Sequence, residues 1–113
     1  MTGTAGTVGE AFYATKLVRN IISRGLYISI DNGEEEPTDP SRVEGTILPC
    51  LGATEIEMLR FYRRDAGGLH HAGSFCLVWG NCPSGEELVC DHTDNRLCES
   101  IWGEVFGRET ACA

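Results

Sequence analysis

The chain has 113 residues and a mass of 12.3 kDa, which excludes two independent cores and predicts one domain over residues 1–113. Its 17 acidic and 9 basic residues give a formal net charge of -8. This balance argues against direct binding to nucleic acid or to an anionic membrane, because both attract clustered Lys and Arg. The hydrophobic fraction of 42% is that of an ordinary globular domain and excludes a disordered chain.

The ends of the chain and its cysteines indicate the cellular compartment in which the protein is expected. Residues 1–6 and 109–113 are expected to be frayed, and residues 1–9 lack the basic and apolar segments of a secretory signal. We therefore expect a cytoplasmic protein without membrane contact, in which cysteines remain free thiols. The six cysteines are Cys50, Cys76, Cys82, Cys90, Cys98 and Cys112. Because Cys76, Cys90 and Cys98 fall within patterned elements, they are expected to be buried.

A helix and a strand are predicted first. Apolar residues recur with helical spacing over residues 8–24, Thr7 and Glu10 have capping-box spacing, and Gly25 suits the helix stop. Residues 26–31 alternate between apolar and polar side chains, which predicts a half-buried strand closed by a turn.

A second helix is expected after the acidic run that follows this strand. Thr38 or Asp39 would cap it, Pro40 would lie in its first turn, and Pro49 would end it. Its apolar residues at helical spacing would be Val43, Ile47, Leu48 and Leu51, and Gly45 would weaken the helix.

Three strands are predicted in the second half. The first follows a short turn at residues 54–57 and runs to Arg64, and residues 65–68 form the next turn. Residues 73–80 are apolar at consecutive positions, which is typical of a central strand covered on both sides. The third strand spans residues 87–92.

A last helix is predicted from its strong apolar periodicity. Thr93 or Asp94 would cap it, and Gly107 would end it. Because short loops join the last three strands, they must pair antiparallel. The predicted fold is α+β, with a three- to four-stranded, mainly antiparallel sheet packed by N-terminal, middle and C-terminal helices.

Charge is concentrated in two acidic blocks. Residues 31–57 hold eight acidic and one basic residue, and residues 86–113 hold seven acidic and two basic ones. If the blocks share one side of the fold, they form a negative surface that can steer a basic protein partner. The alternative is acidic surface that only keeps the domain soluble. The candidate partner-binding residues are Asp31, Glu34, Glu35, Glu36, Glu86, Glu87, Asp91 and Asp94.

Cysteine and histidine raise two chemical alternatives. A zinc site would draw on Cys82, Cys90, His92 and Cys98, with Cys90 and His92 on one strand face, but no Cys-x2-Cys pair is present. A Cys–His nucleophile would pair Cys76 or Cys90 with His92, or with His70 or His71 from the expected hairpin loop. Apolar neighbours are expected to raise the pKa of these thiols, which disfavours that reading.

The densest polar cluster is DHTDN at residues 91–95. It could bind a divalent cation or supply an acid–base pair, but capping of the last helix explains the same residues. Gly-rich phosphate-binding motifs are missing, and Trp79 and Trp102 lie on apolar stripes typical of a core. We therefore predict no catalytic residue, metal or cofactor.

The runs GSFCLVWGN at residues 73–81 and EELVCDHTDN at residues 86–95 carry a family resemblance. They resemble small uncharacterised proteins of phages and other mobile elements, which tend to show a G-x-F-x-LVYGN strand and a V-x-DYTDN strand before a final helix. The likeness covers roughly residues 17–106, and Trp79 and His92 stand where Tyr is common. The resemblance implies a phage or mobile-element setting and supplies no catalytic residues.

The leading hypothesis is a non-enzymatic, acidic protein-binding domain that inhibits or modulates a host protein with a basic surface. Host proteins that handle nucleic acid or act in defence have such surfaces. Two alternatives remain: a small Cys/His or metal-dependent enzyme that uses residues 91–95, and a structural accessory that acts through homodimerisation.

Overall fold

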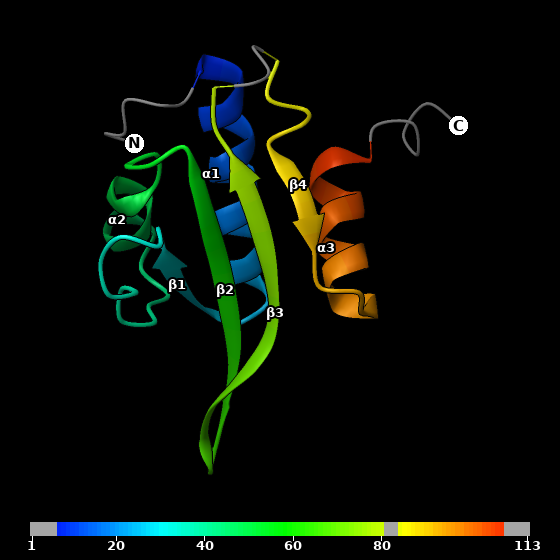
Figure 1. Ribbon diagram of the computed structural model, residues 1–113. Coiled ribbons are helices and arrows are strands. Elements are labelled where there is room, and N and C mark those ends of the chain that lie inside the picture. Colours follow the sequence, from blue (N-terminus) through cyan, green and yellow to red (C-terminus); the bar gives the residue numbers. More distant parts are fainter. Residues whose placement is uncertain (1–6, 81–83, 108–113) are drawn as a thin grey trace.

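The computed structural model describes residues 7–80 and 84–107, so the predicted frayed ends lie outside the described residues. Helices and strands follow one another in the order α1, β1, α2, a short 3₁₀ helix η1, β2, β3, β4, α3 (Figure 1). The four strands form one antiparallel sheet with the order β1-β2-β3-β4. The predicted α+β class, with helices near the start, middle and end of the chain, is confirmed.

Helix α1 (Val8–Ser23) begins at the predicted capping box. The Thr7 hydroxyl accepts a hydrogen bond from the Glu10 backbone N–H at 3.1 Å, and the Glu10 carboxylate accepts one from the Thr7 N–H at 2.9 Å. The helix ends at Arg24, after which Gly25 adopts a φ of 79°. The predicted helix is confirmed to within one residue.

Strand β1 (Tyr27–Asp31) is an edge strand whose outer side is bonded to the segment that follows it. Ile28 and Ser41 exchange two backbone hydrogen bonds of 2.8 and 2.9 Å, and the Thr38 hydroxyl accepts one from the Ile30 N–H at 2.9 Å. These bonds occupy edge groups of β1 that would otherwise be open to pairing with another chain.

The expected helix at Thr38 or Asp39 is therefore wrong, because Thr38 serves β1 instead of a helix terminus. Helix α2 (Glu44–Ile47) begins later, with Val43 as its N-cap residue, and leads into η1 (Leu48–Cys50), which contains Pro49. Pro49 is tolerated there because it lies in the first turn of the 3₁₀ helix.

Strands β2 (Ile56–Asp65) and β3 (Gly68–Val78) form a long hairpin that extends past the other strands (Figure 1). The predicted strand to Arg64 and its turn are confirmed. However, β3 begins five residues before the predicted Gly73, so His70 and His71 lie in a strand and not in a loop. Both faces of the hairpin tip are exposed to solvent, so these residues lack the apolar alternation that identifies a half-buried strand.

The final elements are β4 (Val89–His92) and α3 (Arg96–Phe106), followed by Gly107 as the C-cap residue. The N-cap residue is Asn95, whose side-chain oxygen accepts a hydrogen bond from the Cys98 N–H at 2.8 Å. The expected cap at Thr93 or Asp94 is wrong because the Thr93 hydroxyl accepts from the Ser74 N–H of β3 instead.

Two sides of the sheet differ in what covers them. Helices α1 and α3 contact each other and form a layer against one side, where α1 passes behind β2 and β3 (Figure 1). The sheet contributes four large side chains to the core on that side: Leu59, Phe61, Phe75 and Leu77. No described helix covers the opposite side, which we call the open face. The expectation that β3 is covered on both sides is therefore wrong.

None of the described helices has the length and apolar character needed to cross a membrane.

Candidate docking face

Strand register arranges the open face in cross-strand rows. One row spans all four strands and is made of successive cross-strand partners: Asp31, Met58, Cys76 and Asp91. A second row lies nearer the hairpin end, four residues away along β1 and β2, and consists of Tyr27, Tyr62 and His71. Because side chains alternate between the two faces of a strand, both rows lie on the open face.

The apolar part of the open face lies where β2 begins and β3 ends. Ile56 pairs with Val78, and Met58 pairs with Cys76. Ile56 is 57% exposed, and Met58 and Val78 are half-buried. We call Ile56, Met58 and Val78 the apolar strip. Uncovered apolar side chains grouped in this way mark interaction sites more often than ordinary surface does.

The two acidic blocks lie at opposite edges of the sheet. Glu34, Glu35 and Glu36 follow the end of β1 and are exposed, and Glu86 and Glu87 precede the start of β4 and are exposed. The end of β1 and the start of β4 lie at the same end of the sheet because β1 and β4 run in opposite directions. Strands β2 and β3 separate the blocks, so they flank the apolar strip instead of merging into one patch.

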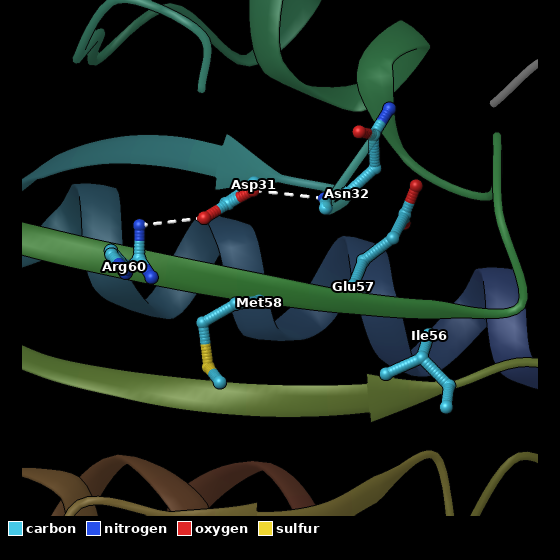
Figure 2. Close-up of a pocket in the computed structure, with 7 residues that line it drawn as sticks. Asp31, Asn32, Ile56, Glu57, Met58 and Arg60 are labelled. Atoms are coloured by element: carbon cyan, nitrogen blue, oxygen red, sulfur yellow. Dashed lines mark hydrogen bonds and ion pairs between the residues drawn. The ribbon is translucent and has the colours of Figure 1, made fainter. Parts of the chain in front are cut away.

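The remaining candidate residues are placed individually. Asp31 and Asp91 share one row and hence the open face, whereas exposed Asp94 follows β4 toward the hairpin end. A carboxylate oxygen of Asp31 lies 2.9 Å from a guanidinium nitrogen of Arg60 (Figure 2). Asp31 is therefore partly neutralised, and Asp91 is the exposed carboxylate of that row.

An open depression of about 300 Å³ lies beside the Asp31–Arg60 ion pair (Figure 2). Its lining residues are Asp31, Asn32, Gly33, Ile56, Glu57, Met58 and Arg60. Ile56 and Met58 contribute apolar side chains to this lining, and Asp31 and Arg60 contribute charged ones.

The hairpin end of the open face carries arginine and aromatic side chains that sequence reasoning missed. The guanidinium groups of Arg42 and Arg64 lie 5.6 and 5.8 Å from the ring centre of Tyr27. Hydrogen bonds from Arg64 and Arg42 lower the pKa of the Tyr27 hydroxyl. The only sequence signal was the net positive charge of residues 58–85, since Arg42 joins the group through tertiary folding.

Cysteine burial differs from the prediction. Cys98 is fully buried, which raises the pKa of its thiol, but Cys76 is half-buried and Cys90 is exposed. The register shifts between Cys76 and Leu77, so Cys90 is an extra, bulged residue in β4. The expected burial of Cys76 and Cys90 is wrong because their sulfurs lie on the open face. Cys82 and Cys112 lie outside the described residues.

The zinc reading finds no support among residues 7–80 and 84–107, which contain no group of three or more metal-ligating side chains. The predicted shared face of Cys90 and His92 is also wrong. The bulge brings Cys90 to Cys76 on the open face, whereas the His92 ring lies 5.7 Å from the buried ring of Phe75. The zinc candidate Cys82 lies outside the described residues.

None of the proposed thiol–histidine pairs is formed by the described side chains. His70 contacts Asp65, His71 contacts Ser74, and His92 contacts the Thr93 carbonyl, each at 2.9 Å. Burial, together with the neighbouring Cys90, raises the pKa of Cys76 to about 11, so its thiol is protonated at neutral pH.

The polar cluster at residues 91–95 serves the junction between β4 and α3. Asp91 accepts from the His92 N–H, and Thr93 accepts from the Ser74 N–H. Asn95 caps α3 and donates to the Ala72 carbonyl at 3.0 Å. These bonds account structurally for the same residues that could have served acid–base chemistry.

Comparison of the chain with protein-family models, with curated proteins and with solved structures finds no match.

Proposed function

We propose that the chain is a small acidic protein-binding domain whose open face docks on a protein with a basic surface. The observation that carries the proposal is the apolar strip (Ile56, Met58 and Val78) exposed between two acidic edges. Protein interfaces commonly have an apolar centre and a polar rim, and a charged rim selects partners of opposite charge. The partner would place an apolar side chain against the strip and basic side chains against the two edges.

The resemblance of residues 73–95 to phage and mobile-element proteins supports a partner in a host cell. Proteins that handle nucleic acid carry basic grooves, so an acidic domain can occupy such a groove and exclude the nucleic acid. The proposed role is therefore an inhibitor or modulator of a host nucleic-acid-handling or defence protein in the cytoplasm. Direct binding of this chain to nucleic acid is opposed by its net charge of -8.

Matched charge reversals test this proposal in affinity capture from host lysate. Glu35→Lys alters the acidic edge beside β1, and Glu99→Lys makes the same charge change at an exposed position of α3 in the helix layer. Met58→Asp places a charge in the apolar strip. We expect one retained host protein to be lost at high salt, weakened by Glu35→Lys and Met58→Asp, and unaffected by Glu99→Lys. If the host protein is retained equally at high salt and by both Glu35→Lys and Met58→Asp, the proposed surface is excluded.

Homodimerisation is a second candidate, favoured by the charge layout of the open face. Acidic residues flank the apolar strip, and Arg42 and Arg64 surround Tyr27 at the hairpin end of the same face. Two copies packed face to face in opposite strand directions would place unlike charges together. Light scattering distinguishes this arrangement: a dimeric mass that Met58→Asp reduces to 12.3 kDa supports it, and a monomeric wild type excludes it.

A further inference from the structure

The β3–β4 pairing contains an irregularity that brings two cysteines together. Cys76 of β3 pairs with Asp91, and the next residue of β3, Leu77, pairs with Val89. Cys90 is therefore the extra residue of a bulge. In a bulge of this kind two consecutive side chains of the longer strand lie on the side of the single residue opposite. Cys90 and Asp91 thus accompany Cys76 on the open face.

The same geometry places the two cysteines next to each other across the β3–β4 pairing. The Cys90 side chain is close enough to Cys76 to contribute to the raised pKa of the Cys76 thiol. Neighbouring strands lie roughly 4.8 Å apart, within the Cα separations of about 4.4–6.8 Å that a disulfide spans. Both thiols are free, Cys90 is exposed and Cys76 is half-buried. An oxidant in solution can therefore reach Cys90, and Cys76 lies beside it on the neighbouring strand.

We propose that Cys76 and Cys90 form a reversible cross-strand disulfide when the protein meets a peroxide. Hydrogen peroxide converts the Cys90 thiol to a sulfenic acid and releases one water molecule. The Cys76 sulfur then loses its proton, attacks the Cys90 sulfur and displaces the hydroxyl group as a second water molecule. Two thiols are oxidised, one peroxide is reduced to two waters, and a thiol reductant reverses the bond.

The environment of Cys76 favours this order of events. In the reduced protein, burial and the adjacent Cys90 sulfur both raise the pKa of the Cys76 thiol. Conversion of the Cys90 thiol to a sulfenic acid removes the neighbouring thiol that contributes to this raised pKa. Cys76 becomes easier to deprotonate once a sulfur that it can attack has formed. The proposal does not rest on the docking function, because the pair is defined by the β3–β4 bulge alone.

Disulfide mapping of the full-length protein tests the proposal. The folded protein is treated with hydrogen peroxide, its remaining thiols are alkylated after denaturation, and it is digested with trypsin and a glutamate-specific protease. Cleavage at Glu86, Glu87 and Arg96 separates the peptide of Cys76 from that of Cys90. We expect a linked peptide pair that lacks two hydrogens, disappears on reduction and is accompanied by loss of two alkylated thiols.

Cysteine variants assign the bond. Cys82→Ser should retain the linked pair, because Cys82 lies on the same peptide as Cys76 but is not part of the proposed bond. Cys90→Ser should abolish the link and leave Cys76 open to alkylation after denaturation. Three results would overturn the proposal: a link through Cys82, a link between two copies, or alkylation of both Cys76 and Cys90 after peroxide treatment. The wild-type mapping decides the question even if a variant folds poorly.

Discussion

The carboxylate of Glu57 accepts a hydrogen bond of 2.9 Å from the indole nitrogen of Trp79, and both side chains are at most 1% exposed. The same carboxylate oxygen accepts from the Gly52 N–H at 2.8 Å, and the second oxygen accepts from the Ala53 N–H at 3.0 Å. One buried side chain thus fastens the turn before β2 to the residue that follows β3. This bonding stabilises the backbone from which the apolar strip begins.

Glu57→Gln should destabilise the fold, because one carboxylate oxygen is replaced by an amide nitrogen that cannot accept a hydrogen bond. At least one N–H donor among Trp79, Gly52 and Ala53 would lose its partner. We expect a decrease of about 2–3 kcal/mol in the free energy of unfolding, measured by urea denaturation. Glu55→Gln, at the exposed neighbouring position, is the control and should change stability by less than about 0.5 kcal/mol.

Gly85 joins the segment before β4 to the start of α1, and it should not tolerate a side chain. Its φ is 82°, and a Cβ atom there would overlap the backbone of Gly9. Gly85→Ala should therefore lower the free energy of unfolding by more than about 2 kcal/mol. Gly103→Ala is the contrasting variant, because Gly103 lies within α3 and has open space at its Cβ position. It should raise stability by about 0.5–1 kcal/mol; equal effects of the two variants would contradict this account.

The cap of α3 can be assigned by two neighbouring substitutions. Asn95→Ala removes the bond to the Cys98 N–H and the bond to the Ala72 carbonyl, and should cost about 1–2 kcal/mol of stability. Asp94→Ala removes an exposed side chain and should cost less than about 0.5 kcal/mol. Thermal unfolding followed by circular dichroism compares the two. A larger loss of stability in Asp94→Ala than in Asn95→Ala would indicate that Asp94 is the N-cap residue of α3.

Elements defined by local patterns could be predicted from the sequence. The capping box of Thr7 and Glu10 and the apolar periodicity of α1 and α3 are properties of neighbouring residues, and the structure confirms both helices. Predictions failed where a polar side chain was used by a distant strand. Thr38 bonds to β1 and Thr93 bonds to β3, so neither starts a helix although both have the chemistry of a cap.

The docking face depends on register, which single-strand patterns do not contain. Asp31 and Asp91 share a row only because β2 and β3 lie between them in one specific alignment. The acidic blocks were evident in the sequence, but their position at opposite edges follows from the strand order. Cys90 was expected in the core because perfect alternation was assumed, and a single bulged residue shifted its side chain to the open face.

Ionisation of the Cys76 thiol should make the folded protein less stable at alkaline pH. Its folded-state pKa is raised to about 11, whereas an ordinary cysteine thiol loses its proton near pH 9. Between these values the folded state retains a proton that the unfolded state has lost, so the free energy of unfolding falls as pH rises through this window. Buried Cys98, whose pKa is also raised, contributes in the same direction. Cys76→Ser should therefore reduce the slope of stability against pH without abolishing it.

The contribution of Cys90 to the raised pKa of Cys76 can be measured directly. Cys90→Ala removes the adjacent sulfur and leaves burial as the main cause, so the pKa of Cys76 should move from about 11 toward its ordinary value. The ultraviolet absorbance of thiolate, recorded against pH in both proteins, follows the change. Cys50→Ala, at a position in η1 remote from the β3–β4 pairing, is the matched control and should leave the titration of Cys76 unchanged. An unchanged Cys76 titration in Cys90→Ala would mean that the two sulfurs do not interact across the bulge.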